Sequence, residues 1–282
     1  MIEVKDVTFA YSKTPVIKGV TFDVKDGEIF GFLGPSGAGK STLQKILIGM
    51  LSGYSGSVTV NGTEVKHHKG EFYEHIGVDF EFPSLYDKLT ARQNLRFFAS
   101  LYSTATRDAD GLLESVGLLN DADKKVSDYS KGMKSRLGFI KALLHDPRLL
   151  FLDEPTGGLD PSNARLMKDM ILKEREKGKT VILTTHNMED AAELCDRVAF
   201  IVDGKIVAMD TPHRLIMRKS AAKIKYTYLE EGTERQGECG VGETAKDTLL
   251  ASLIFQNRIQ TIHSTEGTLG DVFLEVTGRR LS

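Results

Sequence analysis

The sequence predicts an α/β fold whose core is a mainly parallel sheet with helices on both faces. Three short apolar runs in the second half of the chain have the length of fully buried strands, at Leu149–Leu152, Val181–Leu183 and Val198–Val202. Helical patterns lie between them, and strands that alternate with helices form βαβ crossovers. A fourth apolar run, Glu28–Leu33, leads into a glycine-rich loop and a helical stretch that continues to about Leu51.

An antiparallel β layer is expected at the start of the chain, and a helical insertion in its middle. Apolar and polar side chains alternate over residues 2–11, and residues 16–24 are rich in β-forming types. A further short strand is expected at Ser57–Val60, before a turn at Asn61–Gly62. Residues 84–147 read as mostly helical, because apolar residues recur there at helical spacing, most clearly over residues 131–145.

A change in composition near Asp210–Pro212 divides the chain into a main domain over residues 1–212 and a small C-terminal α+β domain over 213–282. The second domain is expected to contain a strand at Lys223–Tyr228 and then a glycine-rich loop. A helix at Ala245–Gln256 and a terminal helix at Leu269–Thr277 complete it.

The composition of the 282 residues is that of a globular protein, with 40% hydrophobic and 27% charged side chains. The net charge of −2 gives no general attraction to nucleic acid or anionic lipid, and nucleic acid is not expected as a partner. Cys195 and Cys239 form neither a disulfide framework nor a metal-ligand pattern, which favours a reducing cytosol. No apolar run is long enough to span a bilayer, so any membrane role requires a partner chain.

A phosphate-binding loop follows the buried strand that ends at Leu33. Its residues fit the pattern GxxxxGK[ST], and the strand before it and the helix after it are the context in which that pattern binds nucleotides. Glycines let the backbone curl so that several N–H groups face phosphate oxygens at a helix N-terminus. Lys40 is expected to contact the outer phosphates of ATP, and the Ser41 hydroxyl to ligate Mg²⁺. The predicted nucleotide contacts here are Gly34, Pro35, Ser36, Gly37, Ala38, Gly39, Lys40, Ser41 and Thr42.

Two acidic residues, Asp153 and Glu154, follow the strand Leu149–Leu152. The carboxyl ends of parallel strands meet at one edge of a sheet, which is also where the phosphate-binding loop lies. Asp153 is therefore expected to hold Mg²⁺, directly or through water, and Glu154 to act as general base on the attacking water.

Together with these motifs, three further segments make the chain resemble the nucleotide-binding subunits of ABC transporters over about residues 1–215. Ser130-Lys131-Gly132-Met133 begins a helix, Gly158-Leu159-Asp160 follows the acids, and His186 follows the strand Val181–Leu183. The resemblance implies a head-to-tail dimer that encloses two ATP molecules, with Ser130 and Gly132 of one chain facing the phosphate-binding loop of the other. It also implies that Tyr11 stacks on adenine, that Asp160 bridges the dimer and that His186 contacts the γ-phosphate.

The residues alone leave plainer roles open for several of these side chains. The sequence is equally compatible with Tyr11 as an ordinary aromatic residue of a strand and with His186 as a loop histidine at the end of a strand. Ser130 is also a good N-cap for the helix that it precedes, which is compatible with phosphate binding because a helix start presents free N–H groups either way.

The chain departs from the family pattern at two places. The usual signature Leu-Ser-Gly-Gly-Gln is replaced by residues 129–133, which keep Ser130 and Gly132 but lack the glutamine. The family's mid-chain glutamine, which helps hold Mg²⁺, aligns with Glu81. Glu81 is therefore either a third metal ligand or a residue of the groove that receives the membrane subunit, near Phe80, Phe82 and Tyr86.

The segment Gly267–Gly278 resembles the ending of bacterial and archaeal drug-export and polysaccharide-export ATPases. The chain is thus expected to hydrolyse ATP to ADP and phosphate at the cytoplasmic face of the membrane. This reaction would energise export of a small molecule, with a fluoroquinolone-type drug as one candidate. The implied partners are a separate transmembrane permease and a second ATPase chain, identical or different. The alternatives are a soluble ABC ATPase of translation or DNA maintenance and a non-catalytic cassette.

Overall fold

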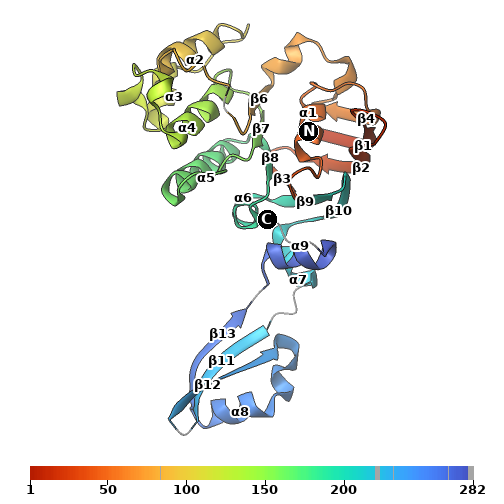
Figure 1. Cartoon of the computed structure of the whole chain (residues 1–282), viewed down its shortest axis with the longest axis vertical. Helices are drawn as coiled ribbons and strands as arrows, with labels where there is room; N and C mark the ends of the chain where they lie inside the picture. The colour runs from red at the N-terminus through yellow and green to blue at the C-terminus, as the bar shows by residue number, and fades with distance from the viewer. Residues whose placement is uncertain (83, 220–222, 231, 266, 279–282) are drawn as a thin grey trace. The chain divides into compact units, whose positions relative to one another are not determined.

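The computed structural model of the chain describes residues 1–82, 84–219, 223–230, 232–265 and 267–278. The chain forms two compact units, Met1–Met209 and Asp210–Ser282 (Figure 1). The division falls close to the predicted one at residues 212 and 213. Residues 279–282 of the predicted C-terminal domain lie outside the described residues.

A six-stranded, mainly parallel sheet forms the centre of the first unit. Its order is β10-β9-β3-β8-β7-β6, and the pairs β9–β3, β3–β8, β8–β7 and β7–β6 are parallel. This confirms the predicted parallel core. The strands are β3 (Ile29–Leu33), β6 (Ile76–Asp79), β7 (Leu149–Asp153), β8 (Thr180–Thr185), β9 (Arg197–Val202) and β10 (Lys205–Asp210). Helices α5 (Pro161–Glu176) and α6 (Met188–Leu194) follow β7 and β8.

An antiparallel sheet of order β2-β1-β4-β5 forms the second layer, as the alternating sequence predicts. Its strands are β1 (Ile2–Phe9), β2 (Ile17–Val24), β4 (Ser55–Val60) and β5 (Thr63–Glu64). Apolar side chains of this sheet share one buried core with Phe30, Phe32 and Phe151 of the central sheet and with Leu43 of α1 (Lys40–Leu47). Burial of these aromatic and aliphatic groups holds the two sheets and α1 together.

Helix α1 ends at Leu47, earlier than the predicted Leu51, for a local steric reason. Gly49 has φ 77°, and a Cβ atom there would lie 2.8 Å from the ring of His68. The left-handed conformation of Gly49 stops the helix, and no other residue type fits without strain.

The predicted helical insertion contains α2 (Ala91–Ala99), α3 (Ala109–Ser115) and α4 (Lys131–Ala142), which pack against one another (Figure 1). Each helix begins at a side-chain cap, namely Thr90, Asp108 and Ser130. Short 3₁₀ helices occur at η1 (Val65–His67), η2 (Gly70–Glu74), η3 (Leu119–Asp121), η4 (Val126–Asp128) and η5 (Val241–Lys246).

The second unit contains a three-stranded antiparallel sheet of order β12-β11-β13, with helices α7, α8 and α9. Tyr226, Leu250 and Leu253 form its small core. Strands β12 and β13 were not predicted, because β12 is largely polar and shows no apolar alternation. The elements are α7 (Pro212–Lys219), β11 (Lys223–Glu230), β12 (Thr233–Gly240), α8 (Thr248–Phe255), β13 (Ile259–Thr265) and α9 (Leu269–Thr277).

Candidate functional site

The phosphate-binding loop connects the carboxyl end of β3 to the start of α1, as the sequence predicts. A Cβ atom at Gly34 would overlap the carbonyl oxygen of Ile201, and one at Gly39 would lie 2.9 Å from Cδ1 of Ile17. Gly39 also has φ 108°, a conformation that side chains disfavour. The loop is therefore held close to the sheet, while Ser36 and Gly37 are exposed at its tip.

Lys40 is buried, and its ammonium donates to the carbonyl oxygens of Gly34 (2.6 Å) and Pro35 (3.1 Å). Burial lowers the pKa of Lys40, and the carboxylates of Glu154, Asp153 and, more weakly, Glu81 oppose this effect. No carboxylate of the described residues lies within ion-pair distance of this ammonium. The ammonium can therefore turn to a phosphate without breaking an ion pair.

Asp153 and Glu154 lie at the carboxyl end of β7, beside β8. The register pairs Asp153 with Thr184, whose hydroxyl donates to the Asp153 carboxylate. Glu154 has φ 48°, and its carboxylate accepts bonds from the hydroxyl of Thr185 (3.0 Å) and from Nδ1 of His186 (2.8 Å). A left-handed backbone at a non-glycine residue costs about 1–2 kcal/mol, so the surrounding contacts must hold it.

The structure thus brings Glu154 and His186 together, although they are far apart in the sequence. The Glu154 side chain is 12% exposed and that of His186 is 56% exposed. An ionised carboxylate can only accept hydrogen bonds, so His186 donates through Nδ1 and leaves Nε2 on its open side. The pair resembles a base whose position is fixed by a second group, which is the arrangement that general-base catalysis needs.

Gly132 and Asp160 are connected within the chain through a residue that sequence reasoning missed, Asn163, and Ser130 lies at the start of the same helix as Gly132. Ser130 caps α4 by accepting a bond from the backbone N–H of Met133 (3.2 Å). A Cβ atom at Gly132 would lie 2.7 Å from Cγ of Asn163, and Nδ2 of Asn163 donates to Asp160 (2.5 Å). This bond is the largest cause of the lowered pKa of Asp160.

A family model described as "ABC transporter" matches residues 17–157, which include the phosphate-binding loop and both acids of β7. A fluoroquinolones export ATP-binding protein of Mycobacterium tuberculosis is 50% identical over 285 residues, covering 100% of this chain and 95% of the relative. The chain belongs to the ABC transporter family. As an ABC ATP-binding subunit it binds ATP and is an ATPase, which confirms the predicted family, fold class and enzyme class.

Two further ABC proteins are similar to this one. The Nod factor export ATP-binding protein I of Rhizobium meliloti is 39% identical and covers 99% of this chain and 89% of its own. A solved ATP-binding cassette in a dimeric post-hydrolysis state, bound to ADP and phosphate, has a TM-score of 0.66 and 25% identity. That structure covers 75% of this chain and 98% of its own. The family assignment does not favour the alternative of a soluble ABC ATPase in translation or DNA maintenance.

Tyr11 of this ABC protein lies beyond the end of β1, which stops at Phe9, and not within a strand as predicted. Its ring is 59% exposed, packs edge-on against Phe9 at 4.9 Å, and its hydroxyl lies 3.4 Å from Oγ1 of Thr42. An exposed aromatic face beside the phosphate-binding loop is available for stacking. The predicted contact with adenine stays a prediction.

The acids that follow β6 differ from those that follow β7. Glu81 is exposed, and its charge acts on Lys40 from beyond hydrogen-bond distance. Asp79 is buried, with Oδ1 lacking a hydrogen-bond partner among the described residues, and burial raises its pKa to about 7. Sequence reasoning missed Asp79, whose only signal is an acid at the end of an apolar strand.

The site is better suited to a metal ion that binds together with the nucleotide than to one held by protein side chains alone. No group of three or more His, Cys, Asp or Glu side chains in the described ranges could hold a metal ion. Ser41 at the start of α1 and Asp153 offer the few protein oxygens that Mg²⁺ usually takes when phosphates supply the others. The residues present therefore fit Mg²⁺ bound together with ATP.

Proposed function

We propose that this ABC ATPase energises the export of a small molecule through a separate permease at the cytoplasmic face of the membrane. Its 50% identical relative is named for fluoroquinolone export and its 39% identical relative for Nod factor export, which supports an exporter. Among the described residues, no helix is long and apolar enough to cross a bilayer. We assign the permease to another chain because both relatives are named as ATP-binding proteins of export systems, and fluoroquinolones are the first substrates to test.

Hydrolysis in this proposal depends on Glu154 as general base. Lys40 and the backbone N–H groups of residues 36–42 hold the phosphates of ATP. Ser41 and Asp153, with Glu81 as a third candidate, hold Mg²⁺, which would neutralise charge on the phosphates when bound. The attacking water gives a proton to Glu154, whose carboxylate the hydroxyl of Thr185 and Nδ1 of His186 hold in place. This fixed carboxylate beside the phosphate-binding loop is the observation that carries the proposal.

His186 would contact the γ-phosphate through its open nitrogen. Nδ1 is used as a donor to Glu154, so Nε2 is the atom that remains for the nucleotide. A phosphate oxygen accepts hydrogen bonds, and Nε2 can donate one only when the ring carries both protons.

The second half of each site would come from a second chain in a head-to-tail homodimer. Ser130 caps α4, and the start of this helix presents free N–H groups and a partial positive charge to an anion. Gly132 lets Asn163 of α5 pack closely against the first turn of this helix. Asp160, held by Asn163, would bridge the two chains. The similarity to a dimeric cassette bound to ADP and phosphate supports this arrangement. A heterodimer with another ABC chain is the alternative that co-purification would reveal.

The membrane subunit would contact exposed aromatic side chains around α2. Phe82 is 80% exposed, and Tyr86 packs against Phe97 at 5.0 Å, with both rings partly open to solvent. Exposed aromatic groups that lie together usually mark a surface for another protein. No nucleic acid is expected to bind.

Co-expression with the candidate permease tests the proposed function. We expect the two chains to purify together and a fluoroquinolone to stimulate ATP hydrolysis by the complex. Cells that make the complex should accumulate less drug, and Glu154→Gln in the same complex should restore accumulation. Stimulation by other compounds only would contradict the substrate, whereas a complex without ATPase activity would contradict the proposal as a whole.

A further inference from the structure

Helices α4 and α5 meet at a polar contact close to the groups that the proposed ATP site takes from a second chain (Figure 1). Helix α4 belongs to the helical insertion, and α5 follows the acids at the end of β7. Ser130 caps α4 and Asp160 caps α5, so the two residues that would meet the partner chain stand at the starts of these helices. A contact that fixes one helix start relative to the other therefore determines the shape of the surface that the partner meets.

The side chain of Asn163, in the first turn of α5, makes this contact. Its carbonyl oxygen accepts a bond of 2.6 Å from Nη1 of Arg136 on α4, and its amide nitrogen donates a bond of 2.5 Å to the Asp160 carboxylate. The backbone N–H groups of Ser162 and Asn163 also donate to that carboxylate, each at 3.1 Å. An ionised carboxylate only accepts and a guanidinium only donates, so the amide satisfies both groups in one orientation.

Gly132 lets the two helices approach closely at this point. A Cβ atom there would lie 2.7 Å from Cγ of Asn163 and 2.8 Å from its Nδ2 and Oδ1 atoms. Gly132 and Arg136 are four residues apart on α4, so they lie on the same face of that helix. The amide of Asn163 is thus held against the backbone of α4 at one turn and by the guanidinium at the next.

The guanidinium of Arg136 is only partly satisfied without this amide. Among the described residues, its Nε atom is buried and lacks a hydrogen-bond partner. A buried donor that loses its acceptor is costly. Loss of the Asn163 amide would therefore favour movement of Arg136, and of the turn of α4 that carries it, away from α5.

We propose that Asn163 is a positioning residue of the shared ATP site, an inference that rests on the two-chain arrangement proposed above. Its amide joins the first turn of α4 to Asp160 and so fixes the half-site, namely Ser130, Gly132 and Asp160, that a chain presents to the ATP of its partner. A misplacement of about 1 Å in a catalytic site can cost about a hundredfold in rate. The link therefore acts on turnover and not on the nucleotide affinity of the loop in the same chain.

Asn163→Asp alters this link with little change in shape. The new carboxylate can still accept a bond from Arg136, but it repels the Asp160 carboxylate instead of donating to it. Steady-state ATPase assays should show kcat about tenfold lower, since a lost hydrogen bond to a charged group usually costs about that much. The affinity for ADP, measured by calorimetry, should be unchanged because the loop of the chain is intact. Asn120→Asp, at an exposed asparagine of η3, is the matched control and should keep the wild-type kcat.

Mixed dimers test on which side of the ATP site Asn163 acts. Lys40→Ala lacks a working loop and Ser130→Arg blocks the start of α4, so their mixed dimer has one intact site. That site takes its loop from the Ser130→Arg chain, and Ser130 and Asp160 from the Lys40→Ala chain. Asn163→Asp should lower the restored rate about tenfold when it is added to the Lys40→Ala chain, and should cost little in the Ser130→Arg chain.

A difference between the two arrangements cannot come from a general loss of stability, because both contain the same substitution. Equal losses in the two arrangements, or no loss in either, would overturn the role of Asn163 while leaving the shared site in place. If the mixture of Lys40→Ala and Ser130→Arg restores no activity, the shared site itself is overturned, and the role of Asn163 with it.

Discussion

Strands β7 and β6 are neighbours in the central sheet, and each has one acidic side chain at its carboxyl end and another shortly after it, at the same edge. After β7, Asp153 accepts a bond from Thr184, and Glu154 accepts bonds from Thr185 and His186. At β6, the buried Asp79 has one carboxylate oxygen without a partner among the described residues. The exposed Glu81, just beyond the strand, makes no hydrogen bond or ion pair with any of the same residues.

This difference separates acids that are organised before ATP arrives from acids that are not. A general base must be held within hydrogen-bond reach of the water that it activates, and only the acids after β7 have such support. Burial of the Asp79 carboxylate instead costs free energy that the surrounding groups offset only in part. Three of the four substitutions below test whether the two strand ends do different work, and Lys40→Ala tests the phosphate-binding loop that they face.

Glu154→Gln should have the largest effect. The amide keeps the shape of the side chain but cannot take a proton, so ATP hydrolysis should slow about 10²–10⁴-fold while ATP still binds. Steady-state ATPase assays and ATP-binding calorimetry measure the two quantities, and gel filtration with ATP should show a trapped dimer. Glu114→Gln, at an exposed glutamate of α3, is the control and should keep the wild-type rate. Near-normal turnover by Glu154→Gln would show that the better-supported acid at the end of β7 is not the general base, and the contrast between β7 and β6 would then have no catalytic meaning.

Lys40→Ala should weaken nucleotide binding itself. The side chain supplies a cation beside polyphosphate, and loss of a charged hydrogen bond costs about 1.5–3 kcal/mol, or roughly ten- to a hundredfold in affinity. Calorimetry with ATP and Mg²⁺ would show the loss, and Lys205→Ala, at an exposed lysine of β10, should not. An unchanged affinity would mean that ATP is held elsewhere.

Asp79→Asn should change how stability depends on pH. Burial raises the pKa of Asp79 to about 7, above the value near 3.9 in an unfolded chain. The folded state therefore binds the proton more tightly, and wild-type stability should fall as pH rises from about 4 to 7. The variant lacks this loss and should gain about 1–3 kcal/mol relative to wild type between pH 5 and pH 8.

Denaturant unfolding of both proteins at the two pH values measures that gain. If the free energy of unfolding depends on pH in the same way in wild type and Asp79→Asn, the neighbours of Asp79 offset the cost of burying its carboxylate. The strand ends would then be equally well supported, contrary to the comparison.

Glu81→Gln should have the smallest effect. If the carboxylate helps to hold Mg²⁺, the amide is a weaker ligand, and the Mg²⁺ concentration for half-maximal ATPase should rise a few-fold, about two- to tenfold. Mg²⁺ titrations of the two proteins decide this. Superimposed titrations would place Glu81 outside the metal site and favour contact with the permease, which a transport assay would then detect.

Local motifs made the central site predictable from the sequence. The loop at Gly34–Ser41 is one continuous segment of the sequence, and so is the acidic pair at the end of β7. The strand before each segment is strongly apolar, so both the chemistry of these residues and their place in the sheet could be anticipated. The bond between Glu154 and His186 depends on β7 and β8 being neighbours, which spacing alone does not give. The contact of Asn163 with Asp160 and Gly132 depends likewise on how α4 and α5 pack.

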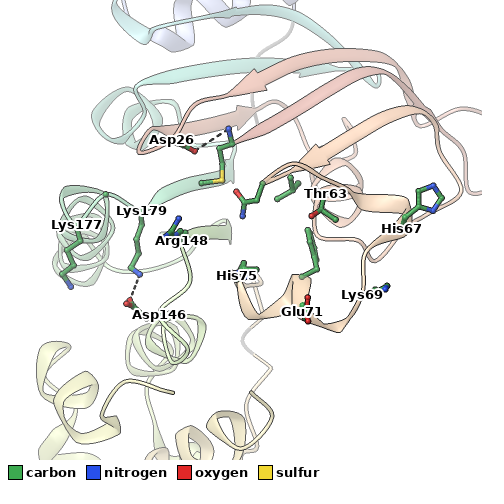
Figure 2. A pocket seen from close by; sticks show the side chains of 15 residues that line it. Asp26, Thr63, His67, Lys69, Glu71, His75, Asp146, Arg148, Lys177 and Lys179 are labelled. Carbon is green, nitrogen blue, oxygen red and sulfur yellow. Dashed lines mark hydrogen bonds and ion pairs between the residues drawn. The ribbon is translucent and has the colours of Figure 1, made fainter. Parts of the chain in front are cut away.

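Other features could not be predicted because their sequence signal is weak. Strand β12 is polar on both faces, so it resembles a loop in composition, and among the described strands it pairs with β11 alone. Asp79 looks like any acid that ends a strand, and only packing shows that it is buried. A cavity at the amino ends of β6, β7 and β8 is lined by residues from distant segments, such as Lys69 and Arg148 (Figure 2).

The central claim is that each ATP site combines the phosphate-binding loop of one chain with Ser130 of another. Mixing two inactive proteins tests it directly. Lys40→Ala has a defective loop, and Ser130→Arg should block the start of α4 with a bulky side chain. Each protein alone should be nearly inactive as a homodimer. A mixed dimer restores one intact site, so an equimolar mixture should regain about a quarter of the wild-type ATPase rate if the chains associate at random. A mixture no faster than the average of the two separate variants would contradict a site shared between chains.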